Sequence, residues 1–232
     1  MTIAILGRFD GGFAWQADPG EFMERSSTAL VEDGRVWLID PIRAPGLEDE
    51  ISALGTVAGI IMTFGWHDRD VDWYARRYGV PVYARRAGGR MLIASPVQWV
   101  ECHLPGSALQ LLDASGQGLL RLWRESVVWW PERRVLVAGD ALGNAHYFVR
   151  PGERLAVHPV RRLSPPRQLA SLQPERIYVG HGTPVVERAS EALAHALRTA
   201  RPALAAAWWH SLVSTLQWVR RRARPGSAGP SR

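Results

Sequence analysis

The sequence has one cysteine, no lysine and no long apolar run. A single cysteine, Cys102, excludes an internal disulfide framework. All 28 basic residues are arginine, and with abundant Ala, Gly and Pro this usage indicates a GC-rich bacterial genome. No segment reaches the roughly 18 apolar residues needed to cross a bilayer, and residues 1–7 lack the features of a secretion signal. We therefore expect a cytoplasmic bacterial protein.

The net charge of +6 is concentrated at the C-terminal end. Residues 219–232 contain five arginines and no acidic residue, which leaves 23 basic and 22 acidic residues in the rest of the chain. A nearly neutral body argues against a nucleic-acid partner. A second basic cluster lacks interleaved aromatic residues, and we interpret it as solvated surface. Its members are Arg76, Arg77, Arg85, Arg86 and Arg90.

Apolar periodicity and turn residues predict a mixed α/β fold. Two β-rich runs around Asp33-Gly34 predict a hairpin over 27–41. A strand over 57–63, a helix over 68–78 and a strand over 81–84 form a βαβ pattern, which places ligands at the carboxyl end of the strands. Further strands are expected over 1–7, 108–112, 119–123, 126–130, 134–138 and 176–179, and further helices over 47–54, 165–172, 186–199 and 202–222.

Polar residues beside glycine follow three of the predicted strands. His67 and Asp68 come after the strand over 57–63, Asp140 follows Gly139, and His181 stands between two glycines. Side chains at strand ends can converge above a sheet, and imidazole and carboxylate groups suit zinc or iron. His67, Asp68, Asp140 and His181 are therefore the candidate metal ligands.

In these strings the sequence resembles the metallo-β-lactamase superfamily over roughly residues 1–200. The resemblance rests on the hairpin ending in Ile39-Asp40-Pro41, the strand into Thr63, and the Gly139-Asp140 and Gly180-His181-Gly182 turns. It implies an αβ/βα four-layer sandwich, to which this chain adds a C-terminal helix. It also implies metal-dependent hydrolysis of an ester, thioester, amide or phosphodiester of a small molecule.

The sequence departs from the family's main ligand string, Thr-His-x-His-x-Asp-His. Aligned on the end of the strand over 57–63, Phe64, Trp66 and Arg69 occupy three ligand positions, and only Asp68 is kept. His67 falls on a position that the family leaves free, although a local shift of the loop could turn it inward. Two metal ions are therefore not expected.

A further family ligand is a histidine in a Gly-His-x-Pro-Gly string, about nineteen residues before the Gly-Asp turn. Counting back from Asp140 reaches Arg121, and no histidine lies between His103 and His146. The string around His103 has similar lettering but lies 37 residues before Asp140. His103 is either a displaced ligand or, as we favour, a turn residue.

The surviving candidates allow two interpretations. Three protein ligands with a water in the fourth position can hold a catalytic zinc or iron ion, whose water becomes the nucleophile. Alternatively, Arg69 pairs with Asp68, Asp70 or Asp140 and replaces the metal's charge. Asp68 and Asp140 also fit helix caps, and His181 fits a structural turn. We predict no metal or one ion, in a degenerate hydrolase or in a non-catalytic binding or assembly module.

The predicted organisation is a domain over 1–200, a Trp/Arg-rich helix over 201–222 and a disordered basic tail over 223–232. Apolar residues recur along the helix at helical spacing and favour packing on the domain or on a second copy in a homo-oligomer. With the arginines that follow, an anionic membrane surface is the less favoured alternative. The apolar residues are Leu204, Trp208, Trp209, Leu212, Leu216, Trp218 and Val219.

Overall fold

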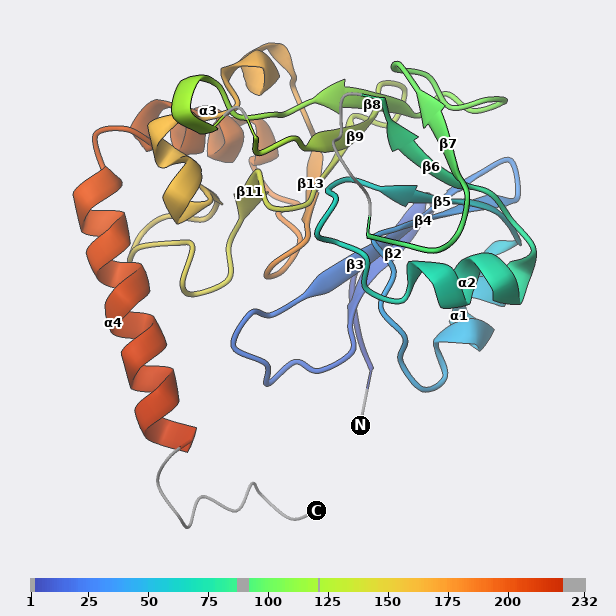
Figure 1. Ribbon diagram of the computed structural model, residues 1–232, viewed down its shortest axis with the longest axis horizontal. Helices are drawn as coiled ribbons and strands as arrows, with labels where there is room; N and C mark the ends of the chain where they lie inside the picture. The colour runs from blue at the N-terminus through green and yellow to red at the C-terminus, as the bar shows by residue number, and fades with distance from the viewer. Residues whose placement is uncertain (1–2, 87–91, 121, 223–232) are drawn as a thin grey trace.

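Two β-sheets lie face to face in the computed structural model, which describes residues 3–86, 92–120 and 122–222 (Figure 1). The larger sheet follows chain order: β1 (Ala4–Phe9), β2 (Gly12–Gln16), β3 (Ser26–Glu32), β4 (Arg35–Ile39), β5 (Thr56–Met62), β6 (Val82–Arg85) and β7 (Val97–Val100). The smaller runs β13 (Arg176–Val179), β10 (Val135–Ala138), β9 (Ser126–Trp130) and β8 (Gln110–Asp113), and a ribbon pairs β11 (Leu142–Gly143) with β12 (Ala156–Val157). The predicted tail over 223–232, Arg90 and Arg121 lie outside the described residues.

Four α-helices and three short 3-10 helices complete the fold. The helices are α1 (Leu47–Leu54), α2 (Val71–Tyr78), α3 (Ala189–Thr199), α4 (Leu204–Arg222), η1 (Gly118–Leu120), η2 (Pro159–Leu163) and η3 (Arg167–Ser171). Within the described part of the chain, no helix is long and apolar enough to cross a membrane. In Figure 1, α4 stands at one side of the body and extends beyond it.

The predicted hairpin and βαβ unit are confirmed. β3 pairs antiparallel with β4, and Asp33 (φ 48°) and Gly34 (φ 73°) make the left-handed turn that a tight hairpin requires. β5 and β6 are parallel and joined by α2. The strand predicted over 119–123 is wrong: Gly118–Leu120 forms a 3-10 turn, and residue 121 lies outside the described residues. The helix predicted over 165–172 is the short 3-10 helix η3.

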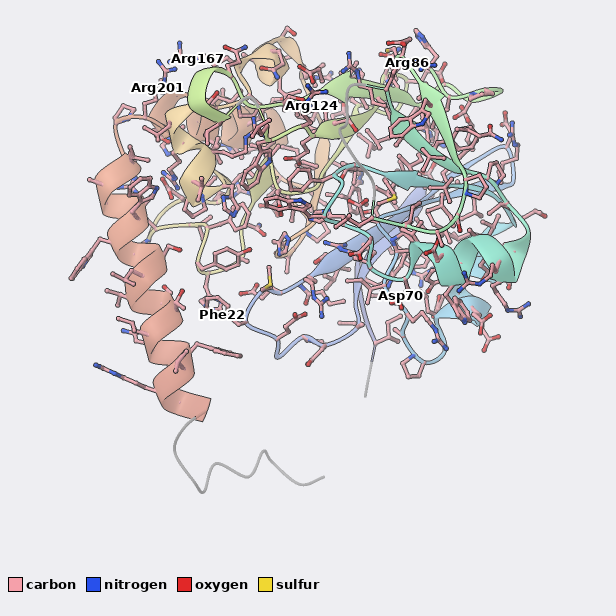
Figure 2. All side chains as sticks on the ribbon, viewed as in Figure 1. Phe22, Asp70, Arg86, Arg124, Arg167 and Arg201 are labelled. Carbon is pink, nitrogen blue, oxygen red and sulfur yellow. The ribbon has the colours of Figure 1, made fainter. Side chains whose placement is uncertain are left out.

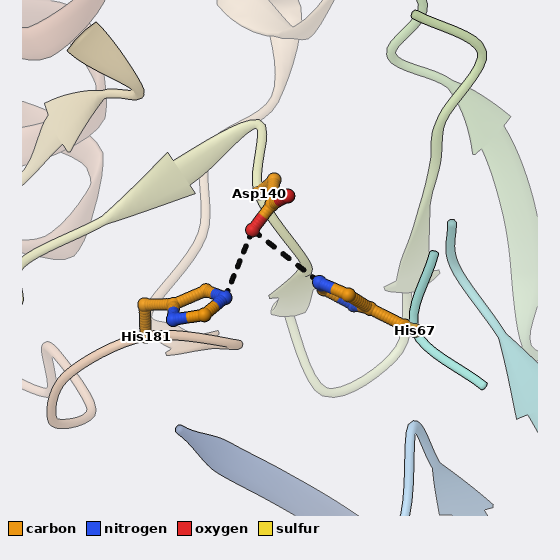
Figure 3. A group of neighbouring side chains, drawn as sticks. All are labelled: His67, Asp140 and His181. Carbon is orange, nitrogen blue, oxygen red and sulfur yellow. Dashed lines mark hydrogen bonds and ion pairs between the residues drawn. The ribbon is translucent and has the colours of Figure 1, made fainter. Parts of the chain in front are cut away.

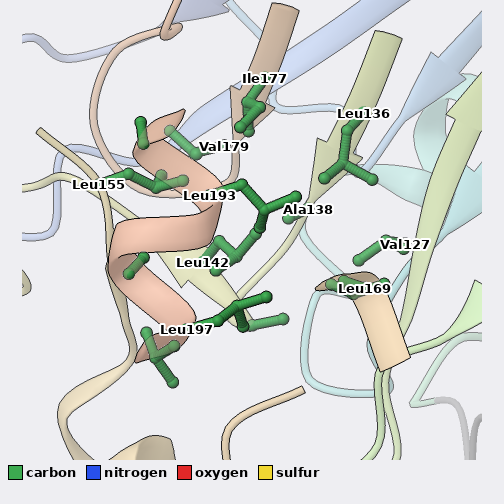
Figure 4. Close-up of a cluster of buried hydrophobic side chains, with 14 of the residues drawn as sticks. Val127, Leu136, Ala138, Leu142, Leu155, Leu169, Ile177, Val179, Leu193 and Leu197 are labelled. Atoms are coloured by element: carbon green, nitrogen blue, oxygen red, sulfur yellow. The ribbon is translucent and has the colours of Figure 1, made fainter. Parts of the chain in front are cut away.

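Alternating side chains of the strands build the layers. In β4, Val36 and Leu38 pack toward α1 and α2, whereas Trp37 and Ile39 pack toward the smaller sheet. The smaller sheet buries its other face under α3 (Figure 4). The sequence of layers is therefore helix, sheet, sheet, helix, which is the predicted αβ/βα sandwich.

A buried ion pair joins η2 to the loop before β12. Arg162 is 1% exposed, and its Nη2 lies 2.8 Å from Oε2 of Glu153, whose side chain is 4% exposed. Arg162 Nη2 also donates to the Phe148 carbonyl at 3.1 Å. Arg162 and Arg150 donate hydrogen bonds that outweigh the effect of burial and lower the pKa of Glu153 to about 2. The carboxylate is therefore charged at neutral pH.

Replacing the carboxylate of this pair should strongly destabilise the fold. We expect Glu153→Gln to lower the free energy of unfolding by about 3–5 kcal/mol, because Arg162 would keep its buried charge without a counter-charge. The matched control Glu187→Gln removes a carboxylate that is 84% exposed and should change stability by less than about 0.5 kcal/mol. Urea unfolding followed by tryptophan fluorescence measures both, and equal stabilities would contradict the prediction.

Candidate metal centre

His67, Asp140 and His181 meet at one end of the two sheets (Figure 3). They follow β5, β10 and β13, respectively. Asp140 Oδ1 lies 2.9 Å from His181 Nε2 and 3.3 Å from His67 Nε2. All three side chains are nearly buried, with exposures of 7% for His67, 3% for His181 and 14% for Asp140. The structure thus brings together three of the four predicted ligands.

The second nitrogen of each imidazole faces an acceptor. His67 Nδ1 lies 2.9 Å from Asp40 Oδ2, and His181 Nδ1 lies 2.9 Å from the Met23 carbonyl. Protons on both Nδ1 atoms satisfy these acceptors and leave both Nε2 lone pairs directed at the Asp140 carboxylate. Histidines that bind metals are oriented in this way by carboxylates or carbonyls.

The three ligand atoms fit one metal ion. They all lie within 4.8 Å of one another, and two ligands of a tetrahedral zinc are separated by roughly 3.3 Å. The two distances at Asp140 are close to this separation. Three converging acceptors also repel one another unless a cation or added protons lie between them. The donor set is therefore suited to a single zinc or iron ion, with a fourth position for water.

Buried Asp40 holds the loop after β5 in place. Its carboxylate accepts hydrogen bonds from the Thr63 amide at 2.9 Å and from the Thr63 hydroxyl, in addition to its contact with His67. The sequence drew attention to Asp40 only as the end of a hairpin. Its role in orienting His67 depends on β4 lying beside β5, a contact between strands that residue spacing does not reveal.

Glycines next to the ligands let the strand ends approach closely. A Cβ atom on Gly139 would lie 2.5 Å from the Thr63 hydroxyl oxygen, and one on Gly180 would lie 2.9 Å from the Gly139 carbonyl oxygen. Both contacts are too short for any other residue unless the neighbouring atoms move. Glycine therefore brings Asp140 and His181 within reach of each other and of the loop after β5.

Glu125, which the sequence analysis did not single out, supports Asp140 from behind. It accepts a hydrogen bond from the Ala141 amide at 2.6 Å and another from Trp123 Nε1 at 2.9 Å. Arg161 Nη1 lies 3.3 Å away, and both side chains of this pair are fully buried. Burial raises the pKa of Glu125 to about 7, although Arg161 opposes the rise. Glu125 thus fixes the backbone immediately after Asp140.

Arg69 binds backbone carbonyls instead of a carboxylate. Its guanidinium donates to the Ser26 carbonyl at 2.5 Å, the Asp40 carbonyl at 2.9 Å and the Gly180 carbonyl at 3.1 Å. Among the described residues, no carboxylate lies within ion-pair distance of it, so the predicted pairing with Asp68, Asp70 or Asp140 is wrong. The guanidinium instead joins β3, the end of β4 and the turn after β13.

Asp68 and His103 lie apart from the three ligands. Asp68 is exposed, and its carboxylate accepts a hydrogen bond from the Arg69 amide at 2.9 Å. The helix that Asp68 was expected to cap begins at Val71, after Asp70. His103 is exposed beside β8, where it bridges to Gln110. The loop turns His67 inward in place of Asp68.

Aromatic rings surround the three ligands. Phe64 stacks on Trp123 at a centroid distance of 5.2 Å, and Trp66 is 69% exposed beside both. On the opposite side, Tyr147 and Phe148 lie 6.2 and 5.9 Å from the His181 ring. Phe64 and Trp66, which stand at ligand positions of the family's string, thus form part of an aromatic cluster beside the three ligands.

Charge at the centre strongly favours a protonated His67 when no metal is bound. Burial and Arg69 both disfavour the imidazolium, but Asp140 and Asp40 outweigh them and raise the pKa of His67 to about 9. Burial works to raise the pKa of Asp140, yet the nearby charge of His67 and the hydrogen bond from His181 hold it well below its usual range. A proton or a metal ion can therefore satisfy the same acceptors.

Comparison with known proteins shows the fold. A scan of family models finds no match, and a search of curated proteins finds none either. Among solved structures, VMB-1 is 14% identical (TM-score 0.63; 87% of this chain and 97% of that chain), and TMB-1 is 15% identical (0.60; 85% and 98%). FIM-1 from Pseudomonas aeruginosa, in its mono-zinc form, is 14% identical (0.59; 87% and 97%). The chain has the metallo-β-lactamase fold that its motifs indicated.

Protonation of His67 should make the metal-free protein less stable as the pH rises. The pKa of His67 is about 9 in the folded protein and about 6.5 in an unfolded chain. Its contribution to stability is fully present below pH 6.5 and is lost as the pH rises through 9, with a magnitude on the order of a few kcal/mol. Chelator-treated protein unfolded in urea between pH 6 and 9.5 tests this.

His103→Gln is the matched control for this measurement because it removes an exposed histidine away from the three ligands. We expect this variant to follow the pH dependence of the unmodified protein, and His67→Gln to lose it. An NMR titration of the imidazole signals reads the pKa of His67 directly if His67→Gln does not fold. A folded-state pKa at or below 6.5 would refute the assignment.

Proposed function

We propose that this protein is a hydrolase with a single metal ion held by His67, Asp140 and His181. The observation that supports this most directly is the convergence of two imidazole Nε2 atoms on one oxygen of Asp140, at 2.9 and 3.3 Å. The acceptors that face the two Nδ1 atoms orient the imidazoles as metal ligands are oriented. FIM-1, described in a mono-zinc form, is a precedent for one zinc in this fold.

When bound, the ion would supply Lewis acidity and lower the pKa of a water molecule for attack on the substrate. Asp40 and the Met23 carbonyl would hold the proton of each imidazole on Nδ1. Each Nε2 would then be unprotonated and directed at the metal ion. His158 is a candidate hydrogen-bond donor to the substrate. Its Nδ1 accepts a hydrogen bond from the Val160 amide, and burial lowers the pKa of His158 to about 4. A neutral imidazole with that acceptor role carries its proton on Nε2.

The substrate class proposed is a small molecule with an ester, thioester, amide or phosphodiester bond. The solved neighbours are named as metallo-β-lactamases, so a β-lactam amide belongs in the same panel of test substrates. Aromatic rings beside the three ligands favour substrates with an apolar or aromatic group next to the cleaved bond. The proposed location is the cytoplasm, on the sequence grounds given above.

A second candidate function is a metal-free binding module that uses the same site. The charges of the site favour it, because Arg69 and a protonated His67 carry two positive charges. Asp40 and Asp140 carry two negative charges, so these four groups balance one another without any metal. Arg69 also binds carbonyls at strand ends of both sheets and occupies a ligand position of the family's string. The metal content of the protein distinguishes the two candidates.

Metal analysis is the decisive test. Protein purified without a metal-chelating tag should contain about one zinc or iron ion per chain by plasma mass spectrometry, because three ligands and one water complete a tetrahedral site. Asp140→Ala and His181→Ala should each lose nearly all of the metal. The panel of substrates should then be hydrolysed by the metal-loaded protein and not by the chelator-treated protein.

Two variants serve as matched controls in this experiment. Asp68→Ala and His103→Ala remove exposed residues of the same types outside the three ligands, and both should keep the metal. Loss of metal in Asp68→Ala would contradict the proposed ligand set. Absence of zinc and iron from the unmodified protein, after incubation with either ion, would reject the hydrolase and favour the binding module.

A further inference from the structure

The inner face of α4 packs on the body. Ala203, just before the helix, and Ala207 and Ser214 within it are buried. His210 Nε2 lies 2.9 Å from the His146 carbonyl, and the Trp218 ring lies 5.2 Å from that of Phe22. Figure 2 labels Phe22 on the loop that faces the helix. One face of α4 therefore packs on the body.

The outer face of α4 is an exposed apolar stripe. Trp209 is 69% exposed, Leu212 52%, Leu216 47% and Val219 51%. Their spacing of three, four and three residues places them on one side of an α-helix. Side chains along α4 project away from the body in Figure 2. The apolar residues that the sequence grouped together are thus divided between a packed face and this stripe.

The charge of α4 has a single sign. The helix contains no acidic residue, and its last three positions, Arg220, Arg221 and Arg222, are arginines. In the sequence, a further arginine follows at position 224, and no acidic residue follows. An apolar stripe that ends in a cationic cluster is complementary to a surface with an apolar interior and a negatively charged outer layer.

We propose that the outer face of α4 docks on an anionic lipid surface. The stripe of Trp209, Leu212, Leu216 and Val219 would enter the boundary between headgroups and acyl chains, as amphipathic helices do. Arg220, beside the end of the stripe, would pair with the phosphates of anionic headgroups, and Arg221, exposed in the last turn of the helix, would add to the positive charge near them.

A second copy of the chain matches this face poorly. In a parallel helix pair, Arg220 and Arg221 of one copy would lie beside the same arginines of the other. In an antiparallel pair they would lie beside the first turns of the partner's α4, which have no carboxylate. Like or unpaired charges at the contact disfavour association. A lipid surface supplies the missing negative charge, and a homo-oligomer does not.

The test is co-sedimentation of the full chain with vesicles of phosphatidylcholine alone or in an equal mixture with phosphatidylglycerol. Binding should be strong only with the anionic mixture and should weaken as salt is added. Arg220→Gln with Arg221→Gln should weaken it about twenty-five-fold, since each arginine near such a surface contributes about a fivefold factor. Leu212→Gln with Leu216→Gln should abolish binding.

Matched controls separate this surface from general charge and apolarity. Arg76→Gln with Arg198→Gln removes two exposed arginines elsewhere, and Leu92→Gln with Leu122→Gln removes two exposed leucines. Both double variants should bind vesicles as the unmodified protein does. Absent binding, or equal binding to the two vesicle types, would overturn the proposal. A dimer seen by light scattering and dissociated by Leu212→Gln with Leu216→Gln would assign the face to a second copy instead.

Discussion

Three acceptor atoms meet where the strands of both sheets end, and their mutual repulsion is the constraint on which the centre depends. Both imidazoles are oriented from behind, His67 by Asp40 and His181 by the Met23 carbonyl. Neither ring can turn away without losing its hydrogen bond to one of these acceptors. The group must therefore hold a positive charge between its members. A metal ion and a proton are two solutions to the same electrostatic problem.

The surrounding fold fixes this geometry through close backbone contacts. Gly139 and Gly180 let two strand ends approach each other and the loop after β5. Glu125 accepts a hydrogen bond from the Ala141 amide, immediately after Asp140, and forms an ion pair with buried Arg161. Much of the polar interior of the protein thus lies within reach of the centre. The layers of helices pack on the sheets mainly through apolar side chains.

Patterns of neighbouring residues predicted the turns and strand ends, because interactions between neighbouring residues determine them. The Asp33-Gly34 turn fixes its hairpin, and the glycines beside Asp140 and His181 mark strand ends that can converge. Contacts between distant segments were not predictable, because residue spacing does not tell which strands become neighbours. For this reason the hydrogen bonds of Arg69 to three carbonyls were missed. Helical periodicity likewise indicated the apolar residues of α4 without telling which side of the helix would be covered.

The position of Arg69 affects how this site can change in evolution. Its guanidinium donates to the carbonyls of Ser26, Asp40 and Gly180, so replacing it by histidine would remove a hydrogen bond from each of them at once. Histidines at positions 64 and 66 alone would therefore not restore the family's ligand string. The arginine therefore ties the shape of the centre to strand ends of both sheets, and its replacement would disturb them together.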